Sequence, residues 1–368
     1  MKMAAKLPCD IIIEILSRLP VRSLIRFKCV SKSFHYLISK DPNFKKKHKN
    51  QSAKSVLYLE SPGNRVLSNS LSSFSNDEER IQDLKILDTP VKGSEIWTIY
   101  DSCDGLFCIE ERGRGVFVWN PSTKESKKLP DCPIDIKIVP GIHSRGFTYA
   151  IAYDSISDDY KVFSIFLFLD IGKGLRTKLK SYSLKSDSLW RKVENFPSVD
   201  LWNREKSNLL NGAFHWIAIH GKDNKEPLPF LLVSLEIGTE TYRELSLPWI
   251  SCCTQRFPQL CVLKGKLCLY NLFFSKSFDL WVIEEYGVME SLTKMFTIPF
   301  YEDQPQSTYF TPMYLFEDGK IMLKVITGGR VQVVTYKDGI LASTNLGNSS
   351  YQKARIWTET LISPHLNN

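Results

Sequence analysis

The histidines are the residues of this chain that most readily suggest chemistry, so their spacing is considered first. His215 and His220 lie five residues apart in a segment that reads as a strand. Side chains alternate between the two faces of a strand, so these two point to opposite faces and would not share a metal ion. His215 stands beside Trp216 in an apolar phrase. We therefore interpret His215 as a hydrogen-bonded core histidine.

Cysteines and paired acids offer two further kinds of site. Four of the nine cysteines could suggest a zinc site: Cys252, Cys253, Cys261 and Cys268. Their spacing, however, matches neither a zinc finger nor a zinc ribbon. Buried free thiols in strands explain them better. The acidic pairs Asp158-Asp159 and Glu284-Glu285 resemble acid/base dyads, yet each sits at a turn beside apolar strands, where solvated charge is expected. We predict no metal and no cofactor.

Motif searches lead to the same conclusion. The chain has no GxGxxG, no Walker loop, no GxSxG and no HExxH. Nor do we find polar residues that would converge on a central site. Loop aromatics are the better candidates for recognition, because binding interfaces favour Trp and Tyr. The candidates for a substrate-binding surface are Trp202, Trp249, Tyr301 and Tyr309.

The charge distribution divides the chain into two units. The 368 residues carry a formal charge of +8, but residues 1–50 hold 12 Lys/Arg against 3 Asp/Glu, a charge of +9, and the remainder is near neutral at −1. No apolar run reaches the ~18 residues of a membrane span, and we find no signal sequence. The odd cysteine count without CxxC indicates an intracellular protein with reduced thiols. We expect a cytoplasmic or nuclear protein that binds neither membrane nor nucleic acid.

The basic head reads as four short helices. Proline and capping signals predict helices over 8–18 and 21–30, a third from an N-cap at Ser31 to Ser39, and a short fourth after Asp41-Pro42. The first helix is apolar around more than the ~100° stripe that a small core can bury. Its extra face either meets another protein or docks on the body of the same chain. The Lys45–Lys49 tract is a nuclear localisation signal, a nucleic-acid contact or, as we favour, a solvated helix end.

The body consists of short apolar runs separated by turn residues, which predicts an all-β domain. Phrases of two strands and an apolar exit end at Pro130, Pro197, Pro248 and Pro299, and the last three lie 51 residues apart. Each is preceded or followed by a phrase in which Gly sits at a tight turn opening a buried strand, as in CDGLFCI and LNGAFHWIA. Four-stranded units of about 50 residues favour a kelch-like β-propeller of six to seven blades. A pair of β-sandwiches explains the strands but not the repeated exit.

The head resembles the F-box motif over about 40 residues. The positions that carry this resemblance are Leu7-Pro8, Asp10, Ile15-Leu16, Leu19-Pro20, Ser23-Leu24, Arg26-Phe27 and Cys29–Lys32; Phe34 stands where the family often has Trp. The resemblance implies docking on a Skp-type adaptor and, through it, a cullin. It implies adaptor contacts, alongside the head's own core, at Leu7, Pro8, Ile12, Ile15, Leu16, Leu19, Pro20, Leu24 and Phe27.

The body resembles the F-box-associated domain of plant F-box proteins, a group that includes F-box/kelch-repeat proteins and, at its edge, S-locus F-box proteins. The phrases that carry the resemblance, in the family's order, include SCDGLFCI, WNPSTKESKKLP, IAYDSISDDYKVFSI and LNGAFHWIA. The expected organisation is an F-box at 1–48, a partly loop-rich connection with the first strands at 49–94, and the substrate-binding propeller at 95–368.

Together these resemblances imply the non-catalytic substrate receptor of a Skp–cullin–F-box ubiquitin ligase with an unknown target protein. Two alternatives remain open at this point. The body could be a propeller enzyme or binding module whose helical leader merely packs on it, or the F-box could bind the adaptor as a scaffold without a cullin.

Overall fold

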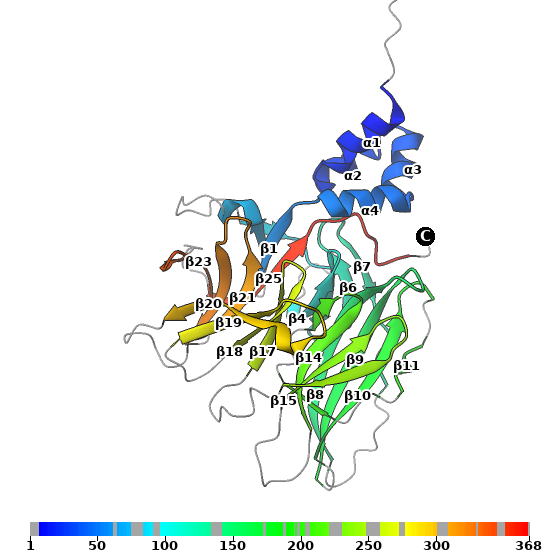
Figure 1. Cartoon of the computed structure of the whole chain (residues 1–368). Helices are drawn as coiled ribbons and strands as arrows, with labels where there is room; N and C mark the ends of the chain where they lie inside the picture. The colour runs from blue at the N-terminus through cyan, green and yellow to red at the C-terminus, as the bar shows by residue number, and fades with distance from the viewer. Residues whose placement is uncertain are drawn as a thin grey trace, which may run out of the picture.

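The computed structural model shows a small helical domain seated on a ring of β-sheets (Figure 1). The residues that it describes are 7–61, 65–74, 84–90, 96–133, 142–171, 174–186, 189–194, 196, 199–202, 207–220, 230–247, 258–271, 277–299, 308–328, 330–343 and 350–366. The predicted loop candidates Trp249 and Tyr301 lie outside this set, as does the side chain of Trp202.

The helices of the head are α1 (Cys9–Ser17), α2 (Val21–Phe27), α3 (Lys32–Ser39) and α4 (Pro42–Gln51). The predicted caps are confirmed: Ser31 Oγ accepts from Phe34 N at 3.1 Å, and Asp41 Oδ1 accepts from Asn43 N at 2.8 Å. These side chains satisfy amides that the first turn of a helix leaves without partners. The second helix ends at Phe27, three residues earlier than predicted.

The body forms six blades of antiparallel strands, with a short helical turn η1 (Leu71–Phe74) in the first and η3 (Met289–Ser291) in the fifth. The strands, blade by blade, are β25 (Ser350–Thr358), β1 (Lys54–Ser61), β2 (Val66–Ser70) and β3 (Lys85–Leu87); β4 (Ile96–Cys103), β5 (Leu106–Glu111), β6 (Gly115–Asn120) and β7 (Glu125–Lys128); β8 (Ile142–Asp154), β9 (Asp159–Asp170), β10 (Gly174–Ser183) and β11 (Arg191–Lys192); β12 (Val199–Trp202), β13 (Asn208–Leu210), β14 (Ala213–His220), β15 (Phe230–Glu236) and β16 (Tyr242–Ser246); β17 (Pro258–Leu263), β18 (Lys266–Asn271), β19 (Ser277–Ile283) and β20 (Leu292–Pro299); β21 (Tyr309–Leu315), β22 (Ile321–Thr327), β23 (Arg330–Lys337) and β24 (Ile340–Ser343).

The repeated glycine phrases are the hairpins between the first two strands of a blade. Asp104-Gly105 joins β4 to β5 with φ of 50° and 81°, and Asn211-Gly212 joins β13 to β14 with φ of 51° and 75°. Two consecutive positive φ values define the turn whose twist suits a two-residue hairpin, and glycine adopts the second without steric cost. The predicted tight turns are therefore confirmed.

The apolar cores lie between neighbouring blades. Phe163 and Ile165 of blade 3 pack with Phe214 and Trp216 of blade 4, and five similar clusters link the remaining neighbours around the ring. Two sandwiches would instead give two separate cores, so the propeller prediction is confirmed, with six blades. Residues 49–94 contain the end of α4 and the outer strands β1–β3 of blade 1.

Blade 1 closes the ring, because its innermost strand comes from the other end of the chain. β25 pairs with β1 from Lys54↔Thr358 to Ser61↔Ser350. On β25, Trp357 is buried, contacts Phe107 of blade 2, and donates from Nε1 to Ser68 Oγ at 3.1 Å. A single side chain thus connects β25 and β2 of blade 1 with blade 2.

We expect Trp357→Ala to lower the free energy of unfolding by about 3–5 kcal/mol, because it removes a large buried side chain at the closure. Urea denaturation measures this change. Trp357→Phe keeps much of the packing and is expected to lose less. Equal losses in the two variants, or no loss in either, would contradict a closure held by the packing of this indole.

Candidate functional site

A stripe of exposed apolar side chains runs along α1. Leu7, Ile11 and Ile15 follow one another at intervals of four residues, and they are 58%, 46% and 50% exposed. Phe27, at the end of α2, is 37% exposed. Residues four apart share one helix face, so Ile11 and Ile15 lie together on α1, and Leu7 comes directly before Pro8, the N-cap of this helix. We call Leu7, Ile11, Ile15 and Phe27 the apolar stripe.

The opposite side of α1 and α2 faces the interior of the head. Leu16, Val21 and Leu24 are buried with Ile38 and Phe44 in one cluster. The sequence proposed Leu16 and Leu24 as adaptor contacts, and the structure instead places both in the core, because their helix faces point toward α3 and α4. Ile12 and Leu19 are half-buried against the same cluster, whereas Pro8 and Pro20 are exposed.

The head meets the propeller through α4, not through the apolar stripe (Figure 1). Lys49 Nζ lies 2.8 Å from Asp104 Oδ2, at the hairpin of blade 2, and Tyr160 OH donates to the same oxygen at 2.8 Å. This arrangement answers the question that the sequence left open, because the second apolar face of the first helix stays uncovered by the body.

The Lys45–Lys49 tract is not simply a solvated helix end, because several of its side chains form ion pairs or are buried. Lys47 Nζ lies 2.6 Å from Glu14 Oε2, and hydrogen bonds from Lys47 and Arg18 lower the pKa of Glu14 to about 2. His48 is buried, its Nε2 lies 3.0 Å from Leu19 O, and burial lowers the pKa of its imidazole. We infer that the tract serves packing and docking of α4.

A central channel of about 840 Å³ lies within the ring, lined by the first and second strands of five blades. Contrary to expectation, polar side chains do converge there; they include Asp101, Ser207, Gln259, Lys324, Lys353 and Arg355. Sequence reasoning missed them because each of the five blades contributes only one or two, so no local pattern marks them. Of the four predicted recognition aromatics, Tyr309 lines this channel.

Polar groups of the channel form hydrogen bonds between different blades. Ser207 Oγ donates to Asp101 Oδ2, which joins blades 4 and 2. Lys353 Nζ donates to Ile99 O at 3.2 Å, and Arg355 Nη2 donates to Tyr100 O at 2.7 Å, so β25 is tied to β4. These contacts give the channel wall a structural role.

The candidate catalytic groups have structural partners. His215 is buried between Asn208 O, 3.0 Å from Nδ1, and Tyr286 OH, 2.9 Å from Nε2, which confirms a core histidine. Cys261 and Cys268 are buried free thiols opposite one another on β17 and β18. Within the described ranges, no group of three or more His, Cys, Asp or Glu could hold a metal ion, and no helix is long and apolar enough to cross a membrane.

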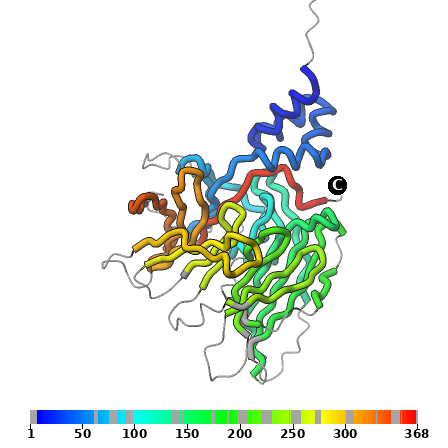
Figure 2. The backbone as a smooth tube through the Cα atoms, viewed as in Figure 1, coloured from blue at the N-terminus to red at the C-terminus, as the bar shows by residue number. Residues whose placement is uncertain are grey.

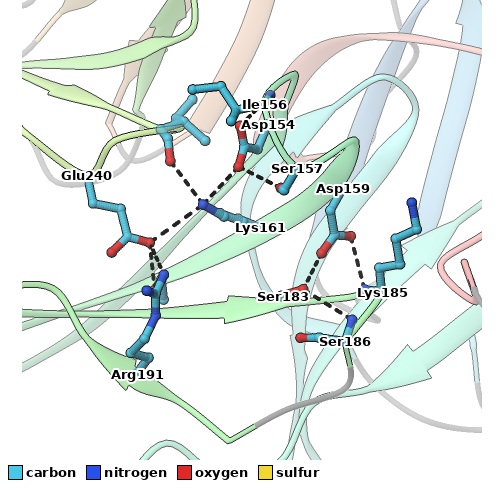
Figure 3. Close-up of polar contacts among 12 residues, drawn as sticks. Asp154, Ile156, Ser157, Asp159, Lys161, Ser183, Lys185, Ser186, Arg191 and Glu240 are labelled. Carbon is cyan, nitrogen blue, oxygen red and sulfur yellow. Dashed lines mark hydrogen bonds and ion pairs between the residues drawn. The ribbon is translucent and has the colours of Figure 1, made fainter.

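Asp159, of the acidic pair Asp158-Asp159, is hydrogen-bonded within blade 3, beside the polar cluster of Asp154, Lys161 and Glu240 that joins blades 3 and 4 (Figure 3). Asp158 is exposed, as expected for a turn. Asp159 is buried, contrary to expectation, since hydrogen bonds from Ser183 Oγ and Lys185 N replace its water. In the second acidic pair, Glu284 is paired with Lys266.

Lys161 is the buried cation of the Figure 3 cluster. Its Nζ lies 2.9 Å from Asp154 Oδ2 and 3.7 Å from Glu240 Oε1 of blade 4, and it donates to Ile237 O at 3.2 Å. Burial by itself would raise the pKa of Asp154, but hydrogen bonds from Lys161, Ser157 Oγ and Ile156 N outweigh it and lower that pKa to about 2. The charges hold two blades together.

Asp154 is expected to contribute about 2 kcal/mol of stability at neutral pH, because its folded pKa lies below its unfolded value. This contribution is present above about pH 4 and is lost as the pH falls toward about 2. In Asp154→Asn, the free energy of unfolding measured by urea denaturation should therefore fall less steeply between pH 5 and pH 2 than in the wild type; this part of the pH profile is the acid limb. The exposed Glu290→Gln is the charge-matched control and should leave that limb unchanged. An unaltered acid limb in the Asp154 variant would exclude this ion pair as its source.

Comparisons with known proteins match both parts of the chain. The F-box domain family matches residues 5–46, and the F-box associated beta propeller domain family matches residues 55–342. F-box protein CPR1 of Arabidopsis thaliana is 27% identical, over 87% of this chain and 79% of that protein. An F-box/kelch-repeat protein of the same plant is 25% identical, over 98% and 96%. A crystal structure of puromycin hydrolase superposes at a TM-score of 0.41 with 10% identity, over 79% of this chain and 45% of that one, too remote to bear on function.

Proposed function

Since the chain belongs to the F-box proteins that carry an F-box-associated β-propeller domain, we propose that it is the substrate-recognition subunit of a Skp–cullin–F-box ubiquitin ligase. The observation that carries this proposal is the uncovered apolar stripe on α1 and α2. Contiguous exposed apolar surface typically marks a protein interface. The stripe lies on the domain whose family binds a Skp-type adaptor.

The proposed adaptor contacts follow from exposure. Leu7, Ile11, Ile15 and Phe27 can be desolvated by a partner without unfolding the head, and Pro8 and Pro20 flank them at the ends of α1. Leu16 and Leu24 support the contact indirectly, because they hold α1 and α2 in place from inside. Ile11 joins the set that the sequence proposed.

The proposed mechanism is positioning and involves no bond chemistry on this chain. The head binds the adaptor, the adaptor binds a cullin, and the propeller holds a target protein near a ubiquitin-charged conjugating enzyme. Holding two reactants together raises their effective concentration. The lysine that accepts ubiquitin belongs to the target, so the proposal requires neither metal nor cofactor, and it places the protein in the cytoplasm or nucleus.

The face of the propeller away from the head is the proposed target surface. The head sits at the Asp104-Gly105 hairpin, on the side where first strands end and second strands begin. First strands such as β17 and β21 begin at the opposite side, where the chain enters each new blade. Tyr309, the first residue of β21, lies at that side and lines the channel. It is the proposed target contact among the described aromatics.

Two other functions remain as competitors. A propeller enzyme would use the polar channel, but Asp101, Lys353 and Arg355 of its wall are hydrogen-bonded to other blades. An adaptor-bound scaffold would share the apolar stripe and lack the cullin. Reconstitution with adaptor and cullin separates the scaffold from the ligase.

We expect the triple variant Leu7→Ala, Ile15→Ala, Phe27→Ala to bind a Skp-type adaptor about 100-fold more weakly than the wild type. Each side chain is already partly buried, so each truncation removes about 1 kcal/mol of apolar burial. Co-expression followed by calorimetric titration measures the affinity.

Ile86→Ala is the matched control for this experiment, since Ile86 is 64% exposed on β3 of the propeller. It should bind the adaptor as the wild type does. A folded wild-type chain that fails to bind, or a triple variant that binds with unchanged affinity, would refute the adaptor proposal.

We expect Tyr309→Ala to reduce target capture while leaving adaptor affinity intact. Quantitative affinity purification from plant cells, compared with the wild type, measures the capture. The control Tyr242→Ala removes a 37%-exposed tyrosine from the outer strand β16. Target candidates are the proteins lost with the first variant and retained with the second. Identical sets of captured proteins with both variants would argue against the channel mouth as the target surface.

A further inference from the structure

The chain does not stop at β25 but continues as an extended segment between the head and blade 2. Figure 1 shows this segment in red, passing beneath α4 and above β6 and β7, and Figure 2 shows the same path. We call residues 359–366 the C-terminal strap. Nothing in the sequence pattern of the strap predicts its position.

Leu361 of the strap completes the hydrophobic core of the head. It is 4% exposed and belongs to the same cluster as Leu16, Leu24 and Phe44. A helical domain of about 45 residues can bury only a small core by itself. A side chain from more than 300 residues away thus supplies part of the packing of α1, α2 and α4.

The two neighbours of Leu361 are fixed to the propeller. Asn120, buried at the end of β6, donates from Nδ2 to Thr360 O at 3.0 Å and to Ile362 O at 2.7 Å. Thr360 Oγ1 donates to Asp104 O at 2.8 Å. The side chain of Ile362 packs against the cluster shared by blades 2 and 3. Leu361 therefore points into the head while its own backbone is held by blade 2.

The close approach of the strap also explains one glycine. A Cβ at Gly105 would lie 2.5 Å from Thr360 Oγ1 and 2.6 Å from Thr358 O. The carboxylate of the neighbouring Asp104 forms an ion pair with Lys49 of α4, and its carbonyl oxygen accepts a hydrogen bond from Thr360 Oγ1. One hairpin thus fastens both α4 and the strap.

We propose that Leu361 is a positioning residue, through which the C-terminal strap locks the F-box onto the propeller in a single orientation. Without the strap, the head would be joined to the propeller only through α4. The connection from α4 to β1 is short, because only Ser52 and Ala53 lie between them. In the ligase this lock sets the distance between adaptor and target. That consequence rests on the proposed function, whereas the lock itself does not.

Hydrogen–deuterium exchange of the full-length chain tests the lock. Leu361→Ala should accelerate exchange of the α1 and α2 amides about 30-fold, because truncating a buried leucine weakens the packing that protects them. Leu361→Met keeps the volume and should restore most of the protection. Leu267→Ala, an equally buried leucine in blade 5, should leave the F-box helices unchanged.

Asn120→Asp separates the lock from simple loss of core packing. The variant keeps the oxygen that accepts from Ser122 N and Thr123 N in the turn after β6, but it replaces the donor that holds the strap. Asn120 is not part of the F-box core, so faster exchange in α1 and α2 while exchange in blade 5 stays unchanged would come through the strap and not through a loss of global stability. Small-angle scattering of the same variant should show a broader distribution of interdomain distances.

The outcomes decide the two proposals separately. Wild-type exchange in α1 and α2 for both Leu361→Ala and Asn120→Asp overturns the lock, whatever the adaptor affinity. Faster exchange confined to blade 2 in Asn120→Asp overturns it as well. Failure of the wild type to bind the adaptor overturns the ligase proposal and leaves the exchange result to decide the lock.

Discussion

The pairing of β25 with β1 is the constraint on which the rest of the structure depends. It joins residues 350–358 to residues 54–61 along the whole length of β1, and it closes a ring whose cores lie only between neighbouring blades. Without this pair, blade 1 would lack its innermost strand, and the clusters on either side would be open to water. The pairing also brings residues 359–366 to the base of the head.

The C-terminal segment, β25 with the strap, therefore both closes the ring and fixes the head on the propeller. β25 completes blade 1, Lys353 and Arg355 tie it to blade 2, and the strap that follows enters the core of the head. The apolar stripe, in contrast, is left open, since α4 and the strap occupy the contact with the propeller. For the proposed substrate receptor this arrangement matters, because flexibility between its two binding surfaces would dilute the effective concentration that it creates.

The site residues show where sequence reasoning succeeds and where it does not. The four helices, their caps at Ser31 and Asp41, and the hairpin glycines follow from local signals, and all are found. The sorting of apolar residues in the head is not local. Leu16 and Ile15 are adjacent and equally apolar, yet one is buried and the other is half exposed. Which of them meets a partner depends on where α3, α4 and Leu361 lie.

The sequence by itself determined the two-part organisation, the all-β body, the repeat near 50 residues and the family, because charge segregation, strand-length apolar runs and turn chemistry are encoded within a few neighbouring residues. Only the tertiary structure decided the number of blades, the polar lining of the channel, the burial of Asp159 and the place of Leu361. Each of these depends on contacts between segments far apart in the chain. The free energy of such contacts comes from the surface that they bury together, and no single segment carries a signal of it.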